Sequence, residues 1–413
     1  MLSGQIRKDF AMLQAGFDQI DITCGPDNSL IGYEFRQQKL PPGNAGVHDP
    51  LSARCLVLDD GETRCVLISL DLCILSSDYA RQLRHAAAEA AETDAGRVIV
   101  ACTHTHSGPL PATQEDVEKR GGFLTRFTGP DGRNPDQQYA ETLLEKVSAS
   151  AAAAAGLLCP VRASFQQAPV GLAYNRRVVR QGQVEHCWNP QESPELSPGP
   201  AVDPTCGVLL LEQVVGRRSV LVFSLGAHPV VLGKTSRVVS ADWPGQACRL
   251  LGQYRPDVRA MFLQGPSGDA HPWVATQEDP ARIEPVARAA AGMVGLLAEA
   301  VRPLGEDIEL STAVESWSCG QHELDLAVWR IGPVYLVAAP VELFGALAID
   351  LRGRLDGPVL LATIANGWTG YWPTVEAIGQ GGYEVDAAKA MGRDTADTQE
   401  LIDRLAALAG RVG

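Results

Sequence analysis

The chain has 413 residues, of which 45% are apolar and 20% are charged, so it can bury a large core and disorder is not expected. Its formal net charge of -14 argues against nucleic acid or an anionic membrane surface as the main partner, because both attract clustered Lys and Arg. A protein that handles a small molecule fits this composition better.

Short β-branched runs alternate with longer Ala- and Leu-rich stretches of helical period, which predicts an α/β fold of mixed sheets layered with helices. The predicted strands are Cys65–Leu70, Val98–Cys102, Val208–Glu212, Val220–Leu225, Ala260–Leu263, Val334–Ala338 and Val359–Ile364. The predicted helices are Asp78–Thr93, Asp136–Ala155, Ala281–Ala300 and Asp397–Leu408. Glycines, prolines and charges predict long irregular loops over Gly25–Asp49 and Asn189–Asp203.

No interdomain linker is apparent, and we expect residues 1–413 to form one domain. Charged and polar residues interrupt the N-terminus, and no run reaches about 18 apolar residues, so we expect neither a signal peptide nor a transmembrane segment. A cytoplasmic location follows as an expectation. The ten cysteines form no C-x-x-C pair, which favours reduced, buried thiols over disulfides or a thiolate zinc site.

The segment Arg97–Pro109, RVIVACTHTHSGP, leads an apolar strand into His104 and His106. In an extended chain residues i and i+2 point to one side, so both imidazoles are expected to face the same space. The H-x-H pattern is weak evidence when it stands alone, because a pair of histidines at a strand end is more often a hydrogen-bonded surface feature than a metal site.

Further strands also end in polar side chains. His228 follows the apolar run of Ser219–Gly233, Glu342 follows Val334–Ala338, and Tyr371 follows Val359–Ile364. Each residue is unremarkable alone, but the carboxyl ends of strands are where the sites of α/β sheets assemble.

The segment Phe262–Trp273, FLQGPSGDAHPW, leaves another predicted strand into a glycine-rich turn that carries Ser267, Asp269 and His271. A serine nucleophile is one interpretation, but the turn lacks the G-x-S-x-G order of a nucleophile elbow. A plain tight turn is the alternative.

Taken together, the order THTHSGP, HP, Q-x-x-x-G-D, P-x-E and N-x-W-x-x-Y-x-x-T resembles the catalytic domain of the neutral (alkaline, non-lysosomal) ceramidases, from about Leu13 to about Glu384. The segment Asp49–Leu72 also resembles that family's entry strands, with Arg54 and Asp71 at matching places. The resemblance implies the catalytic-domain fold without the family's C-terminal immunoglobulin-like domain.

The resemblance also implies a set of site residues. Zn2+ would be the cofactor, and its ligands would be His104, His228, Glu342 and Tyr371. His106 would lie beside the metal and hydrogen-bond the substrate carbonyl or the leaving group, and Tyr371 would also stabilise the oxyanion. An Asn-Arg pair that binds the headgroup in the family corresponds to Asn175 and Arg176, and Asp269 and His271 lie where a substrate would rest.

Two imidazoles and a carboxylate leave zinc an open position, where the pKa of water falls from about 15.7 towards about 7. We therefore expect a zinc-dependent hydrolase that cleaves the amide bond of a small N-acyl compound. His271 replaces a family serine and Leu110-Pro111 replace family glycines, which favours a substrate smaller or more polar than ceramide. The alternatives are a zinc-dependent esterase or deacetylase, a non-catalytic ligand-binding protein, and a hydrolase built on Ser267. The oligomeric state stays open.

Overall fold

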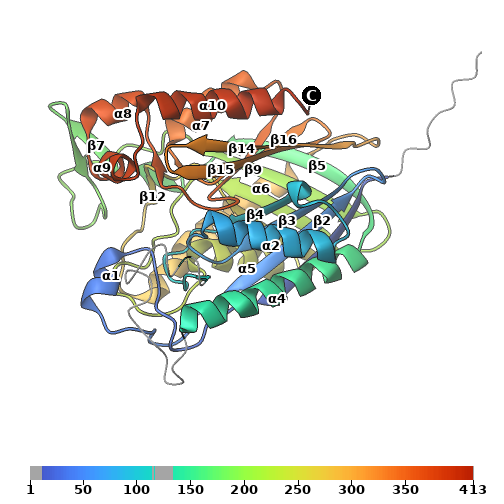
Figure 1. Ribbon diagram of the computed structural model, residues 1–413, viewed down its shortest axis with the longest axis horizontal. Helices are drawn as coiled ribbons and strands as arrows, with labels where there is room; N and C mark the ends of the chain where they lie inside the picture. Colours follow the sequence, from blue (N-terminus) through green and yellow to red (C-terminus); the bar gives the residue numbers. More distant parts are fainter. Residues whose placement is uncertain (1–11, 114–115, 117–133, 413) are drawn as a thin grey trace, which may run out of the picture.

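The computed structural model describes residues 12–113, 116 and 134–412, and these form two mixed sheets layered with helices (Figure 1). The large sheet has the strand order β11 (Val258–Gln264), β10 (Ser219–Leu225), β9 (Thr205–Gln213), β5 (Cys159–Pro169), β1 (Gln14–Asp21), β2 (Ser52–Asp59), β3 (Arg64–Leu70) and β4 (Val98–Cys102), with β13 (Arg302–Pro303) paired to β5. The small sheet has the order β14 (Leu310–Cys319), β15 (His322–Ile331), β16 (Val334–Ala339) and β18 (Val359–Thr363).

Helices cover the outer face of each sheet. The large sheet carries α2 (Ser77–Ala90), α4 (Pro135–Gly156), α5 (Asp242–Tyr254) and α6 (Ile283–Glu299), and the small sheet carries α7 (Gly345–Arg354) and α10 (Thr395–Ala409). Among the described residues the chain also forms the helices α1 (Glu34–Lys39), α8 (Val375–Gln380) and α9 (Tyr383–Ala390), and 3-10 turns at Ala95–Arg97 and Pro280–Arg282. Short strands pair there as β6 (Ala173–Asn175) with β12 (Ala270–Pro272), β7 (Arg177–Arg180) with β8 (Gln183–His186), and β17 (Glu342–Leu343) with β19 (Tyr371–Trp372).

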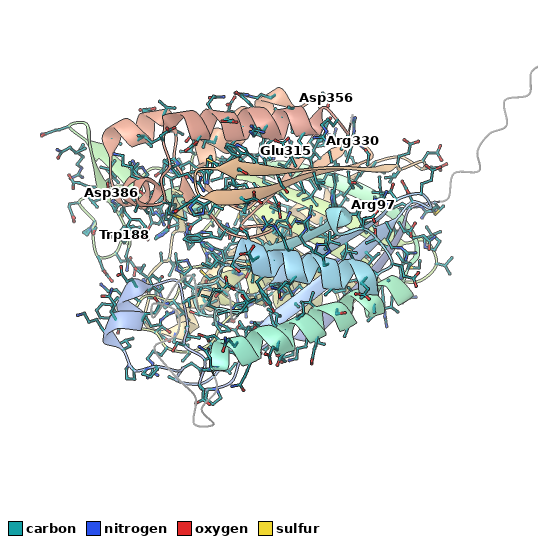
Figure 2. All side chains as sticks on the ribbon, viewed as in Figure 1. Arg97, Trp188, Glu315, Arg330, Asp356 and Asp386 are labelled. Carbon is teal, nitrogen blue, oxygen red and sulfur yellow. The ribbon has the colours of Figure 1, made fainter. Side chains whose placement is uncertain are left out.

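Strand β3 illustrates how the sequence builds these layers. Successive side chains of a strand point to opposite faces. Leu67 therefore packs between the sheets with Leu336 of β16, while Ile68 packs outward with Leu83 of α2 and Val147 of α4. The same alternation along the other strands gives a helix–sheet–sheet–helix sandwich whose interior is filled by side chains (Figure 2).

The predicted fold class is confirmed. The predicted strands correspond to β3, β4, β9, β10, β11, β16 and β18, and the predicted helices correspond to α2, α4, α6 and α10. The loop predicted over Asn189–Asp203 contains no helix or strand. The loop prediction for Gly25–Asp49 is wrong in part, because this segment contains α1. Arg36 fixes this short helix by donating to the carbonyls of Ile31, His106 and Gly233, contacts that sequence periodicity does not reveal.

Two features of the sheets bring distant segments to one place. The large sheet is curved so that its edge strands meet, and Ser69 Oγ of β3 donates to the carbonyl oxygen of Phe262 of β11 at 2.6 Å. The small sheet joins β4 as well, since Cys102 N donates to Ile364 O at 3.0 Å. Because β3 and β4, β10 and β11, and β16 and β18 are parallel neighbours, the loops at their carboxyl ends converge.

No helix within residues 12–113 and 134–412 combines the length and the apolar composition that spanning a bilayer requires.

Candidate active site

Two buried histidines present the same ring nitrogen to one point. His104 follows β4 and His228 follows β10, and they are 2% and 0% exposed. The Nδ1 atom of His104 lies 2.8 Å from the carbonyl oxygen of Cys73, and that of His228 lies 3.2 Å from the carbonyl oxygen of Ala270. Each Nδ1 therefore donates its proton to the main chain, which leaves a lone pair on Nε2.

Glu342, at the start of β17, faces both of these lone pairs. Its Oε2 lies 3.1 Å from His228 Nε2 and 3.4 Å from His104 Nε2. Its Oε1 accepts a 2.9 Å hydrogen bond from the indole Nε1 of Trp368, which fixes the carboxylate plane. The three side chains thus converge on one point in the protein interior.

This donor set fits a divalent metal ion. The ligand atoms of His104, His228 and Glu342 all lie within 4.8 Å of one another, and all three residues are buried. Lone pairs and a carboxylate that converge away from water repel one another unless a positive charge lies between them. Two imidazoles and one carboxylate are a ligand set that catalytic zinc takes.

The pKa values favour a positive charge at this point. Burial lowers the pKa of His228 to about 4, so its imidazole is neutral. Burial opposes ionisation of Glu342, but His104 and His228 outweigh it and hold the pKa of this carboxyl well below its usual range. Burial also lowers the pKa of His104, but Cys73 and Glu342 outweigh it and raise that pKa well above its usual value. The neutral His228 and the ionised Glu342 are forms that bind metals, and a metal ion bound here would replace the proton that the raised pKa keeps on His104.

Tyr371 lies beside Glu342 because β17 and β19 are parallel and these two residues are register partners. Register partners on neighbouring strands point to the same face of a sheet. Tyr371 is 7% exposed, and the Arg176 guanidinium carbon lies 5.6 Å from the centroid of its ring. This position suits the predicted fourth ligand, and ligation by Tyr371 stays a prediction.

His106 lies next to the converging residues with its ring unbonded. Its centroid is 5.0 Å from that of His104, and it packs edge-on against Tyr33 at 5.0 Å. Both ring nitrogens are buried, and neither has a hydrogen-bond partner among the described residues. Burial lowers the pKa of His106 well below its usual value, so the ring is neutral and can donate one proton in a hydrogen bond.

The prediction that the rings of His104 and His106 share one space is confirmed, but its stated reason is wrong. Strand β4 ends at Cys102, and His104 has a φ of +70°, in the left-handed region. The chain is therefore turned, and not extended, between the two histidines. Hydrogen bonds from the His104 amide to Leu72 O and from Thr103 N to Leu70 O hold this turn against the end of β3.

A cavity of about 270 Å³ opens beside these residues. His104, His106, Glu342 and Tyr371 are part of its lining. The rest of its wall is largely apolar and includes Ile31, Ile74, Leu110, Trp368, Ala387 and Met391. The converging side chains therefore lie where a small molecule with an apolar group can reach them.

Arg176 does not line the cavity, and its guanidinium group makes hydrogen bonds within the protein. Its Nε donates to Glu384 Oε1, its Nη2 donates to the carbonyl oxygen of Gly268, and its Nη1 donates to His271 Nε2, all at 2.7 Å. The side chain is only 2% exposed. These contacts suit a residue that positions its neighbours.

Asn175 and Asp269, which adjoin Arg176, are linked to each other by a hydrogen bond. Asn175 Nδ2 donates to Asp269 Oδ2 at 2.9 Å, and Asp269 Oδ1 accepts from Gly345 N at 3.0 Å. The cavity wall, over the described residues, does not include Asn175, Arg176, Asp269 or His271. Their roles in catalysis and substrate binding stay predictions, and direct contact with substrate would require the cavity to extend towards them.

Sequence reasoning missed three residues at this site. Trp368 orients Glu342, and Tyr383 packs against Tyr371 with ring centroids 5.6 Å apart. Cys73 was expected to be an inert buried thiol, but it lies against His104. The motif N-x-W-x-x-Y already contains Trp368, and the parallel pairing of β3 with β4 would have placed Cys73.

The chain matches no protein family model, and the comparison with curated proteins found no match. Its structure is similar to that of neutral ceramidase from Pseudomonas aeruginosa, with a TM-score of 0.75 and 16% sequence identity over 98% of this chain and 75% of that chain. This chain has the neutral-ceramidase fold. A structure described as ceramidase complexed with C2 is similar to the same degree, with a TM-score of 0.74 and 16% identity over 97% of this chain and 75% of that chain.

The resemblance read from the ordered motifs is thereby confirmed for the fold. At 16% identity the neutral-ceramidase fold does not carry an activity with it, because one fold hosts many chemistries.

Proposed function

We propose that this protein is a zinc-dependent hydrolase that cleaves the amide bond of a small N-acyl compound. The observation that carries the proposal is the convergence of His104, His228 and Glu342, two of which, His104 and Glu342, line a largely apolar cavity. In this proposal these three residues hold Zn2+ and Tyr371 completes the set. When bound, zinc supplies a Lewis acid that activates water and polarises the scissile carbonyl.

The unbonded ring of His106 supports a role towards substrate. A neutral imidazole has one N–H to donate and one lone pair to accept. We place its N–H on the carbonyl oxygen or the departing amine, where a proton is needed for an amine to leave. Tyr371, which also lines the cavity, would donate its O–H to the developing oxyanion.

The cavity supports a substrate with a modest apolar acyl group. Its volume of about 270 Å³ is at the small end for ligand pockets, and Ile74, Leu110 and Trp368 would pack against the acyl carbons. The buried hydroxyl of Ser267 has no hydrogen-bond partner among the described residues, and so no histidine base is in place to activate it. This disfavours the alternative of a serine hydrolase.

The proposal is tested by assaying matched amide and ester substrates, such as N-acyl amino acids, N-acyl sugars and short ceramides with their ester counterparts. We expect the zinc-loaded protein to hydrolyse at least one N-acyl amide, and a chelator to abolish this activity while a serine-directed phosphonate does not. His106→Gln should lower kcat roughly 100- to 1,000-fold with zinc content unchanged.

The matched control is His85→Gln, since His85 is an exposed histidine on α2. This variant should retain full activity. Preference for esters over every matched amide would favour the esterase alternative. Full activity of His104→Ala, or no hydrolysis by protein that holds zinc, would overturn the proposal.

A further inference from the structure

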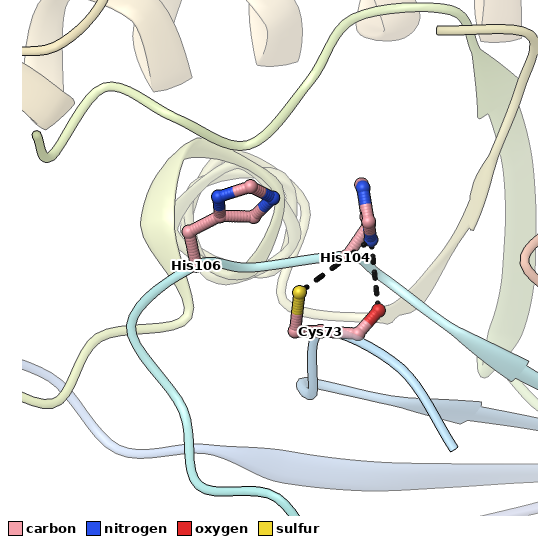
Figure 3. A group of neighbouring side chains, drawn as sticks. All are labelled: Cys73, His104 and His106. Carbon is pink, nitrogen blue, oxygen red and sulfur yellow. Dashed lines mark hydrogen bonds between the residues drawn. The ribbon is translucent and has the colours of Figure 1, made fainter. Parts of the chain in front are cut away.

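The loop after β3 places a thiol against the candidate metal centre. Cys73 is 3% exposed, and its Sγ lies 3.7 Å from Nδ1 of His104 (Figure 3). Cys73, His104 and His106 each offer one ligand atom, and these atoms lie within 4.8 Å of one another. This set differs from the group His104, His228 and Glu342, and the two share only His104.

The unbonded ring of His106, which the proposed function places on substrate, is the second observation that points to a ligand beside Cys73. Both of its buried ring nitrogens lack a partner among the described residues, although buried polar atoms are nearly always hydrogen-bonded. The three residues that converge at the first centre leave this ring unused. Gly32 packs so closely on it that a methyl group there would come within 2.4 Å of its Cγ, so the ring is held in place beside Cys73 and His104.

We propose that Cys73 Sγ, His106 and His104 Nδ1 form a second metal site for a soft or borderline cation such as Zn2+ present in excess. In tetrahedral zinc the sulfur and nitrogen ligands are about 3.5 Å apart, close to the 3.7 Å between Cys73 Sγ and His104 Nδ1. A thiolate with two imidazoles selects such cations over Ca2+ and Mg2+, which prefer oxygen.

The geometry also sets the order in which the sites fill. To bind at Nδ1, the cation must take the place of the proton that His104 donates to the carbonyl oxygen of Cys73 at 2.8 Å. This proton and the thiol proton of Cys73 are both released to solvent, which leaves His104 as an imidazolate. The His104 ring then bridges the two sites, with Nε2 towards Glu342. Both requirements weaken the second site, so it fills after the first.

Occupancy of the second site has a consequence that rests on the proposed function. His106 would no longer be free to donate to substrate, so zinc beyond one equivalent inhibits hydrolysis. Cys73→Ser should raise the concentration of excess zinc needed for half inhibition about tenfold or more, because it removes a ligand.

The site itself is tested without activity, by titrating metal-free protein with Co2+ and recording absorption. A thiolate bound to cobalt gives an intense near-ultraviolet charge-transfer band, whereas the ligands His104, His228 and Glu342 give only weaker visible bands. We expect the intense band to appear above one equivalent in the natural sequence and in Cys159→Ser, whose thiol lies at the start of β5.

Cys73→Ser should lack the intense band, and His106→Ala should need more cobalt to produce it. The visible bands at one equivalent and hydrolysis of the amide at one equivalent of zinc test the first centre separately. No charge-transfer band at excess cobalt, or an equally intense band in folded Cys73→Ser, would overturn the second site and leave the proposed function standing.

Discussion

Gly32 holds His106 in place, and its own backbone requires a glycine. Its φ is +103°, in the left-handed region, and an added Cβ would lie 2.4 Å from His106 Cγ. Gly46 offers a matched comparison, because its φ is +104° and a Cβ there would meet nothing within 4 Å. Comparing an alanine variant at each position therefore distinguishes the effect of backbone strain from the effect of displacing the His106 ring.

We predict that Gly32→Ala and Gly46→Ala each lower the free energy of unfolding by about 1–3 kcal/mol, the cost of an L residue in this conformation. Only Gly32→Ala should also lower kcat/KM for amide hydrolysis, by roughly 100-fold, since a shift of about 1 Å in a positioned group has that effect. Equal activity of the two variants, measured at matched zinc content, would argue against a role of His106 in catalysis.

At the scale of residues, the order of the motifs along the sequence was enough to predict three residues that come together. His104, His228 and Glu342 follow apolar runs, and the structure brings all three together. It could not reveal that Arg176 is held by Glu384, since no local pattern links residues 208 positions apart. Nor could it reveal the turn at His104, because a positive φ at histidine has no sequence signature.

The helix α9 is tied to the strands β7 and β8 by one buried carboxylate. Glu384 accepts hydrogen bonds from Arg176 Nε at 2.7 Å, Arg177 Nη1 at 2.6 Å and His186 Nε2 at 2.8 Å. His186 in turn stacks on Trp188 with ring centroids 4.8 Å apart. Trp188 and α9 lie at the same end of the molecule (Figure 2). This cluster holds Tyr383, the first residue of α9, at the cavity wall.

We predict that Glu384→Gln lowers the free energy of unfolding by about 3–5 kcal/mol at pH 7, because it leaves buried guanidinium groups without their charge partner. Glu376→Gln on α8 is the control, since Glu376 is exposed and its loss should have an effect below about 1 kcal/mol. Urea unfolding of both variants measures the difference. A change at Glu384 no larger than that at Glu376 would contradict the role of the cluster.

The same carboxylate predicts a pH dependence. Burial raises the pKa of Glu384, but Arg176, His186 and Arg177 outweigh it and hold this pKa well below its usual range. A carboxyl whose folded pKa is depressed contributes stability above its unfolded pKa, about 4.3, and loses it as pH falls. The deficit of Glu384→Gln should therefore be full at pH 7 and shrink below about pH 4.

At the scale of elements, long runs with one clear pattern were predicted and mixed runs were not. Apolar β3, β4 and β10 are buried on both faces, so their sequences are continuous and easily recognised. Helix α5 was missed because Pro244 lies in its first turn and the helix begins at Asp242, which has a φ of +51°. Strands β14 and β15 mix charged with apolar residues, since part of β14 faces solvent.

For the molecule as a whole, closure of the large sheet places the candidate metal ligands together. Strands β4 and β11 lie at opposite ends of the strand order, yet the curved sheet brings them together against β18 of the small sheet. Three pairs of parallel strands then direct their carboxyl ends to one place. A metal held there would join both sheets.

The most direct test of this account is elemental analysis of the protein after dialysis against a weak chelator. We predict about one zinc per chain in the natural sequence, held by neutral imidazoles and an ionised carboxylate. His104→Ala, His228→Ala and Glu342→Ala should each lose it while remaining folded. A natural sequence that holds no zinc when the metal is supplied, or three single variants that all retain it, would contradict the central claim.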